Sequence, residues 1–554
     1  MIDQQTGIHE PVQGAPTAPR RRTAAAAATH RQDGRAHRAH AATLAAMCLG
    51  AMMTFLQITA TVSALTTIQR DLRVDPGTLI WIPSAYTLVV ASLVLTAATL
   101  GNRYGRKRMF STGVATMVAG GALVALAATP GWVIAGQLLA GAGGALILAN
   151  SLAILGATFT DPHRRTEVIT AWSAASGIGL AAGPLIAGTL LQHFPWHSVF
   201  LTHIPLGVVT LLVTALWVTE SRQPASRLDI PGLLLGTLTI AAAVYALIQG
   251  GRAGYTSPLA ATAWLASAAG LVGFVLVELR ARTPMLDVRL FRSASFSAVM
   301  VVAAVSLFGF TGVAILLVLF HERAQALSPL ETGWRMLVLF GVYAVAAFAA
   351  GRAIRRTGFK APLTVGLVLG GAACLGLSTQ DPSTPLSHSW ALVALFGAAC
   401  GLVVAPATAA ALASVLPAQA GMASGAVNTA RQVGAVMGTS LLGTLLTSTL
   451  LAELPDRLAA HGVPEPARST VRAAVAAGTS GSTPLPTPVR TALAEALTAG
   501  VQAGLRVNGL VFLVTAVLAL TVIRNRPHQQ RTPVTPDVPR SDLGSPRSPE
   551  GSRR

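Results

Sequence analysis

The sequence is poor in charged residues and in cysteine, and each shortage excludes a class of protein. Only 11% of its 554 residues are charged while 52% are hydrophobic, and the mean hydropathy is +0.59, too apolar for several soluble domains. The three cysteines, Cys48, Cys374 and Cys400, lie in apolar runs without a C-x-x-C spacing or a nearby histidine cluster. We therefore expect inert packing cysteines, no metal site and a polytopic membrane protein.

Acidic residues are also scarce, with 21 Asp and Glu against 40 Lys and Arg, for a formal net charge of +19. A nucleic-acid partner is not indicated, because most arginines fall in the tails and in alternate short loops, as in an oriented membrane protein. The acidic residues from position 71 to position 381 lie in loops or at the ends of apolar segments: Asp71, Asp75, Asp161, Glu167, Glu220, Asp229, Glu278, Asp287, Glu322, Glu331 and Asp381. No carboxylate is therefore expected deep in the membrane.

Apolar runs of spanning length dominate the chain. A helix crosses the hydrocarbon with about 20 predominantly apolar residues. About fourteen such segments occur, at approximately 44–66, 78–100, 110–129, 132–158, 168–191, 199–218, 232–250, 258–277, 297–320, 333–354, 362–379, 389–412, 422–448 and 502–523. Alternate loops are rich in arginine, at 103–108, 164–165, 222–227, 280–292 and 352–360. Basic loops favour the cytoplasm, so both termini are expected there, in a multi-pass protein of the cell membrane.

A short basic turn separates the second and third segments and has a second copy later in the chain. The stretch ATLGNRYGRK at 98–107 aligns without gaps on GRAIRRTGFK at 351–360, so that Gly105 pairs with Gly358. Each copy follows the second helix of a six-helix set, as expected for a transporter made of two parallel halves. The seventh and eighth segments are then an insertion between the halves.

These segments divide the chain into five expected parts. They are a disordered basic cytoplasmic tail (1–40), a six-helix half (41–218), two inserted helices with a cytoplasmic loop (219–296), a second six-helix half with an extracellular loop at 451–497 (297–523), and a disordered cytoplasmic tail (524–554). The first apolar run begins after about 40 polar residues, so we expect a retained anchor rather than a cleaved signal.

The basic turn resembles a loop motif of the major facilitator superfamily, G-x-L-x-D-R-x-G-R-K between the second and third helices. The matching residues are Leu100, Arg103, Gly105, Arg106 and Lys107, and the departures are Ala98 for the first glycine and Asn102 for the acidic residue. The resemblance implies a gate that closes the inward side against the segment beginning near Pro417. Asn102 keeps the hydrogen bonding of this gate and removes its charge.

A second stretch, GIGLAAGPLIAG at 177–188, resembles the fifth-helix motif of the superfamily's antiporters at Gly179, Gly183, Pro184 and Gly188. Glycines at this spacing let helices approach closely and a proline kinks the helix, so plain packing is an alternative explanation. Residues 81–86, 196–207 and 420–438 resemble the fourteen-helix drug:proton antiporter family in particular. The resemblance implies an all-α major facilitator fold with two six-helix halves and two inserted helices.

Two membrane positions depart from that family. Its first helix usually carries an aspartate suited to carry a proton, and its fourth helix an arginine, whereas the alignment places Gln57 and Gln137 there. Losing one partner alone would leave a charge in the membrane at a cost of roughly 2.5–3.5 kcal/mol, but here both are replaced. A neutral hydrogen bond between the glutamines is one explanation, and two unrelated polar residues facing an aqueous cavity are the other.

Three further polar residues are candidates for substrate contact or coupling. Arg431 lies about ten residues into the thirteenth segment, where a substrate oxygen, Asn428 or helix carbonyls are possible partners, and snorkelling is the alternative. His203 can exchange a proton, but it lies a few residues into the sixth segment and is expected at the outer interface.

The sequence thus predicts a non-enzymatic membrane transporter without cofactors. The resemblance implies export of small amphipathic molecules such as drugs, antibiotics or natural products, by alternating access around a central cavity. The partners are the substrate and the bilayer, with protons added if transport is coupled. Two alternatives stay open: a facilitator of the same fold driven by the substrate gradient, and a non-transporting membrane sensor derived from a transporter.

Overall fold

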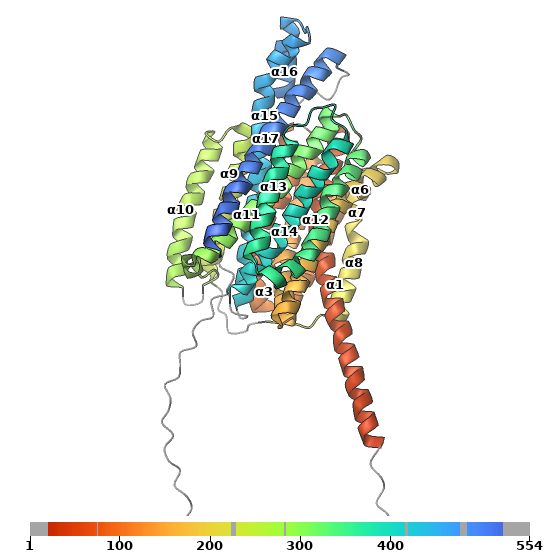
Figure 1. Cartoon of the computed structure of the whole chain (residues 1–554), viewed down its shortest axis with the longest axis vertical. Helices are drawn as coiled ribbons and strands as arrows, with labels where there is room; N and C mark the ends of the chain where they lie inside the picture. The colour runs from red at the N-terminus through yellow and green to blue at the C-terminus, as the bar shows by residue number, and fades with distance from the viewer. Residues whose placement is uncertain are drawn as a thin grey trace, which may run out of the picture.

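The computed structural model describes residues 20–74, 76–222, 229–281, 284–415, 419–476 and 485–523, which form helices joined by short connections (Figure 1). Within these ranges, fourteen helical segments are long and apolar enough to cross a membrane, which confirms the number predicted from the sequence. The predicted tail residues 1–19 and 524–554, and Pro417 at the predicted gate, lie outside the described residues.

The first helices pack into one group, the N-terminal bundle. It comprises α1 (Arg20–Asp71), α2 (Pro76–Leu79), α3 (Trp81–Tyr104), α4 (Arg106–Ala125), α5 (Pro130–Thr158), α6 (Pro162–His193), α7 (His197–Leu201) and α8 (His203–Trp217). α1 packs on α6 and α8, while α5 packs on α3 and α4. The apolar segment predicted at 199–218 is thus divided between α7 and α8.

A second group, the C-terminal bundle, contains the later helices. Its members are α11 (Ala294–Leu319), the π-helical turn η2 (Phe320–Ala324), α12 (Pro329–Thr357), α13 (Lys360–Leu377), α14 (Leu386–Ala413), α15 (Ala420–Ala460) and α17 (Thr487–Val522). α11 packs on α15 and α17, and α14 packs on α12 and α13. The two bundles meet where α6 packs on α12 and α3 packs on α15.

Two helices, α9 (Ile230–Ala253) and α10 (Pro258–Arg280), lie between the bundles in the sequence and stand at one edge of the molecule (Figure 1). They pack on each other, and α9 also contacts α3 and α15. A short 3-10 helix, η1 (Val288–Arg292), leads from α10 to α11.

Several of the scarce acidic residues begin helices. The Asp161 carboxylate accepts a hydrogen bond from the Arg164 backbone N–H at 2.8 Å and caps α6, and Asp229 caps α9 through Gly232 at 2.9 Å. Ser328 and Glu331 form a reciprocal capping box at α12. Such caps satisfy N–H groups that have no partner within the helix, which explains why these carboxylates occur at helix ends.

The structure places the two copies of the basic turn between consecutive helices, α3–α4 and α12–α13. The paired glycines both have a positive φ, 112° at Gly105 and 74° at Gly358. This region is readily adopted only without a Cβ. The chain therefore reverses at equivalent places in both bundles by the same backbone device.

The structure differs from the sequence expectation at two places. α1 begins at Arg20 rather than near residue 44, and most of the loop expected at 451–497 is helical. There, α15 continues to Ala460, α16 (Glu465–Ala476) follows, and α17 begins at Thr487. Leu454, Leu458, Ala492 and Ala496 are buried where α15 and α17 pack together. Because only one face of each extension is apolar, average hydropathy did not reveal it.

Two faces of the molecule follow from this arrangement (Figure 1). We call the end that carries α16 the hairpin face. The opposite end, where α3 finishes at Tyr104, α6 begins at Pro162 and α12 finishes at Thr357, is the tail face.

Candidate substrate cavity and gate

A cavity lies between the two bundles, in the half of the molecule nearer the hairpin face. It is lined by α1, α3, α6, α11, η2, α12 and α15, with the aromatic residues Phe55, Phe310 and Phe340, several aliphatic residues, and the polar residues Thr59, Ser63, Thr87, Thr311, Glu322, Thr332, Gln432 and Thr439. Its volume is about 90 Å³, well below the roughly 300–1,000 Å³ typical of small-molecule pockets. The bundles must therefore move apart to admit a drug-sized molecule.

Glu322 is a cavity residue that the sequence did not identify. Among the described residues that line the cavity it is the single charged side chain. It projects from η2, a π-helical turn that extends α11 by five residues. Sequence reasoning placed Glu322 at a helix end, and nothing in the pattern indicated that a π-turn directs it inward.

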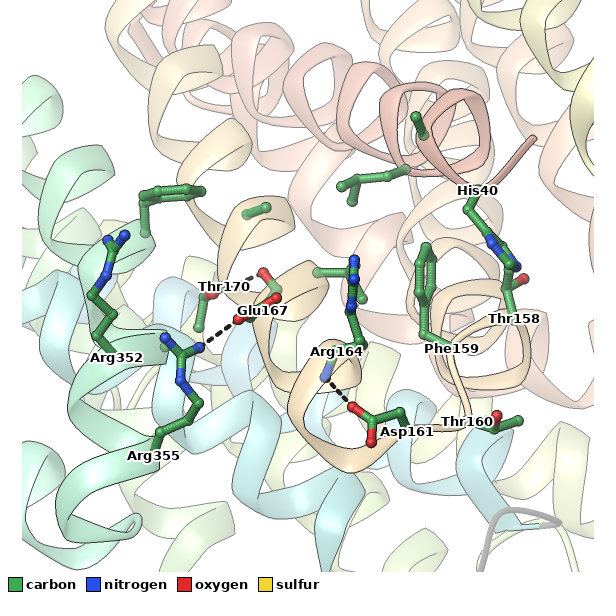
Figure 2. Close-up of a pocket in the computed structure, with 16 residues that line it drawn as sticks. His40, Thr158, Phe159, Thr160, Asp161, Arg164, Glu167, Thr170, Arg352 and Arg355 are labelled. Carbon is green, nitrogen blue, oxygen red and sulfur yellow. Dashed lines mark hydrogen bonds and ion pairs between the residues drawn. The ribbon is translucent and has the colours of Figure 1, made fainter. Parts of the chain in front are cut away.

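The bundles are in direct contact on the tail-face side of the cavity. Ser424 Oγ donates to the Ala149 carbonyl at 3.0 Å, and Asn428 Nδ2 donates to the Leu148 carbonyl at 3.5 Å, both from α15 to α5. At the outermost level, Arg355 of α12 pairs with Glu167 of α6 at 2.6 Å (Figure 2). We refer to these contacts as the tail-face seal.

The predicted gate loop contributes to this seal. Asn102 Oδ1 accepts two hydrogen bonds from the Arg106 guanidinium, at 3.1 and 2.8 Å. The Asn102 amide lies so close to Gly421, near the start of α15, that a Cβ at Gly421 would overlap it. Asn102 thus touches the neighbouring bundle, while Arg103 is exposed at the end of α3.

A residue that sequence reasoning missed, Glu220, supports the same loop. Its carboxylate accepts from the backbone N–H groups of Lys107 at 3.0 Å and Arg108 at 3.2 Å, and so caps α4. The Lys107 ammonium donates to the Ala215 carbonyl at 3.0 Å. A carboxylate from the loop after α8 therefore stabilises the N-terminus of α4, within the same bundle.

Arg431 lies inside the tail-face seal and does not line the cavity. Its guanidinium stands 5.6 Å from the ring centre of Trp172, across the bundle interface, and Nη1 donates to Thr408 Oγ1 at 3.5 Å. The side chain is 2% exposed, and its Nε has no hydrogen-bond partner among the described residues. A buried cation is thus held mainly by an aromatic face that belongs to the opposite bundle.

The structure brings Gln57 and Gln137 together. Gln57 Nε2 donates to Gln137 Oε1 at 2.9 Å, Gln137 Nε2 donates to Thr61 Oγ1 at 3.0 Å, and Thr61 Oγ1 donates to the Gln57 carbonyl at 2.7 Å. Both glutamines are buried, and neither lines the cavity. Of the two explanations for these residues, the geometry favours the neutral pair that links α1 to α5.

The fifth-helix motif is used for close packing on two neighbours. Gly179 lies against the Met52 backbone and Gly183 against Thr59, both on α1. Gly188 faces α12, where a Cβ would stand 3.2 Å from the Leu330 Cα, and Pro184 lines the cavity from within α6. The motif thus joins the α1–α6 contact to the bundle interface.

His203 lies in the part of its spanning helix that is nearer the hairpin face. It begins α8 and is fully buried, against Gly121 of α4. It is not among the residues that line the cavity.

Comparisons with known proteins agree with this geometry. A family model described as Major Facilitator Superfamily matches residues 47–439. The chain is 32% identical over 432 residues to the multidrug resistance protein Stp of Mycobacterium tuberculosis (strain CDC 1551 / Oshkosh), covering 77% of this chain and 80% of Stp. It is 32% identical over 429 residues to the tetracenomycin C resistance and export protein of Streptomyces glaucescens, covering 76% of this chain and 79% of that protein.

Two solved structures share the fold. The human organic anion transporter MFSD10 (TETRAN) superposes with a TM-score of 0.60 at 15% identity, covering 87% of this chain and 99% of that one. The proton:xylose symporter XylE superposes with a TM-score of 0.56 at 13% identity, covering 88% and 96%. At these identities the likeness concerns the arrangement of helices alone.

Proposed function

The chain belongs to the major facilitator superfamily, and from that premise we propose that this multi-pass membrane transporter exports small amphipathic molecules by alternating access. The observation that carries the proposal is the contrast across the bundle interface. A largely apolar, aromatic cavity with one carboxylate lies toward the hairpin face, and a polar seal lies toward the tail face. Rocking of the two bundles would open each side in turn.

We propose that the tail face is cytoplasmic. The arginine-rich loops around residues 103–108, 164–165 and 352–360 all lie at this face. Basic residues close to the ends of spanning helices favour the cytoplasmic side. Substrate would then enter through the opened tail-face seal and leave at the hairpin face.

The two charged groups suggest what kind of molecule is carried. When the seal opens, Arg431 loses Trp172, and its guanidinium, with an unpartnered Nε, becomes available to a substrate. An anionic or strongly hydrogen-bond-accepting molecule would compensate the charge there. At the hairpin face the same molecule meets Glu322, which repels acceptors. Uptake would thus be favoured at the cytoplasmic side and release at the other.

Transport of matched fluorescent amphiphiles tests this function. Proteoliposomes containing the wild-type chain should move an acidic dye and its neutral ester analogue, with the acidic dye preferred. Arg431→Gln should abolish that preference, whereas Arg323→Gln, at an exposed arginine beside Glu322, should keep it. If the protein moves neither dye and no member of a wider panel of amphiphiles, export is refuted and the sensor alternative is left. Equal loss of both dyes in Arg431→Gln would assign Arg431 a structural role.

We further propose that any proton coupling does not pass through the family's usual positions. Gln57 donates a hydrogen bond to Gln137, and neither side-chain amide can titrate. The neutral pair supports the facilitator alternative, in which the substrate gradient alone drives transport.

A further inference from the structure

A groove outside the transport path lies at the tail face, between α1, the α5–α6 connection and the end of α12. Its volume is about 660 Å³, and it is lined by His40, Leu44, Phe159, Arg164, Phe348 and Arg352, among others (Figure 2). We call it the lateral groove. It borders both bundles, since Arg164 belongs to α6 and Arg352 to α12.

The lateral groove holds positive charge that is not neutralised by its own acids. Glu167 pairs with Arg355, and the Asp161 carboxylate caps the α6 backbone (Figure 2). Neither the Arg164 nor the Arg352 guanidinium has a hydrogen-bond or ion-pair partner within the ranges that the structure describes. With three arginines against two carboxylates, the residues that line the groove keep a formal net charge of +1, and each bundle contributes one arginine without a direct partner among them.

Apolar side chains extend from these arginines toward the membrane centre. On α12, Val345 and Phe348 precede Arg352 by seven and four residues, which places all three on one face. Val345 is 71% exposed and Phe348 is 58% exposed. On α6, Ala171 and Ile178 follow Arg164 at intervals of seven residues. Of these apolar residues, Phe348 and Ala171 line the lateral groove itself, beside its arginines, while Val345 and Ile178 continue the apolar faces beyond it.

We propose that the lateral groove binds an anionic phospholipid of the tail-face leaflet. Its phosphate would lie between Arg164 and Arg352, and an acyl chain would follow Phe348 and Ala171. A basic pocket between spanning helices has the chemistry that anionic headgroups require. Free inorganic phosphate would not use the apolar wall. Because the two arginines come from different bundles, the bound lipid holds the bundles together beside the Glu167–Arg355 pair and stabilises the closed tail face.

Native mass spectrometry and thermal unfolding of the full chain test the proposal without any transport substrate. In nanodiscs, replacing part of the phosphatidylcholine by phosphatidylglycerol should raise the Tm of the wild-type chain and leave the lipid bound. Arg164→Gln with Arg352→Gln should bind phosphatidylglycerol about 30-fold more weakly and lose the Tm shift. Arg252→Gln with Arg323→Gln removes the same charge from exposed hairpin-face positions and should retain both effects.

Three results would overturn the proposal. The first is an unchanged Tm shift in the groove variant, and the second is an equal loss of phosphatidylglycerol binding and of the Tm shift in the hairpin-face control. The third is the same rise in Tm with inorganic phosphate in pure phosphatidylcholine, which would make this a soluble-anion site. Should the groove variant fail to fold, a photoactivatable phosphatidylglycerol decides on the wild-type chain. Crosslinks to 158–171 and 345–355 support the proposal, and crosslinks only elsewhere refute it.

Discussion

Two contacts occupy equivalent places in the repeat and close the tail face by different chemistry. The second helix of each bundle, α3 or α12, ends at a copy of the basic turn and meets the fifth helix of the other bundle, α15 or α6. At α3–α15 the Asn102 amide lies against Gly421, while at α12–α6 Arg355 pairs with Glu167 at 2.6 Å. One side of the seal thus depends on shape and the other on charge. Changes that alter only one of these properties should separate the two contacts.

The largest expected effect comes from filling the shape-dependent contact. In Gly421→Leu the new side chain collides with Asn102, so the closed tail face should be disfavoured by about 1–3 kcal/mol, or roughly 5- to 150-fold. A cysteine introduced beside the seal should react faster with a reagent added on the tail-face side. Gly443→Leu, on the same helix, is the control, because a Cβ at Gly443 meets nothing within 4 Å. Equal reactivity in both variants would show that the α3–α15 contact does not limit closure.

The next largest effect is expected at Arg431, which lies ten residues farther along α15 than Gly421. Arg431→Gln should lower transport of acidic substrates by about tenfold relative to neutral ones, since a charge-assisted hydrogen bond contributes roughly 1.5–3 kcal/mol. The ratio of initial rates for an acid and its ester is the measurement. Arg431→Lys, which keeps the charge, should lie between the wild type and Arg431→Gln. If Arg431→Lys and Arg431→Gln are equally impaired, the planar contact of the guanidinium with Trp172 matters instead of the charge.

Restoring the family's charge at the first contact should have a smaller effect. Asn102→Asp faces the positive N-terminus of α15 and should favour the closed tail face by about 0.3–1 kcal/mol, roughly two- to fivefold. Reactivity of the same reporter cysteine should fall. Asn102→Leu keeps the size but loses the hydrogen bonds from Arg106, and should raise it. A fall in both variants would contradict the electrostatic account.

The second contact should respond least among the gate changes. Its side chains are 33% and 49% exposed, so Arg355→Ala should weaken closure by only about 0.2–1 kcal/mol. High salt should abolish the difference between variant and wild type, because exposed pairs are screened. Exchanging the two residues, Arg355→Glu with Glu167→Arg, should restore closure. An effect of Arg355→Ala that persists at high salt would mean that this contact, too, acts through packing.

No effect is expected on proton movement. With a pH-sensitive dye inside liposomes, substrate addition should cause little or no proton flux in the wild type or in His203→Ala, since the buried His203 does not line the cavity. A substrate-dependent flux that survives His203→Ala would exclude the facilitator. Its loss in Glu322→Gln would then identify the cavity carboxylate as the coupling group.

The sequence predicted those features that depend on local pattern. Fourteen spanning helices follow from hydropathy, and the alignment that pairs Gly105 with Gly358 placed a turn at each glycine, where the structure shows a positive φ. The Gln57–Gln137 hydrogen bond was one of two readings, because only the joint loss of two charges indicated it. Glu322 was missed because a π-turn directs it inward, and Glu220 because its helix partner lies more than a hundred residues earlier in the chain.

The length of α15 has a mechanical consequence. The helix that carries Gly421, Asn428 and Arg431 in the seal continues to Ala460 at the hairpin face, where the end of α15, α16 and the start of α17 form a segment that we call the hairpin. At 1.5 Å per residue, Arg431 and Ala460 are about 44 Å apart, so a tilt of about 10° at the seal displaces the far end by roughly 8 Å. The hairpin therefore amplifies the movement of the gate. A fluorophore at its tip and another on α4 would convert each cycle of the transporter into a distance trace recorded from outside the membrane.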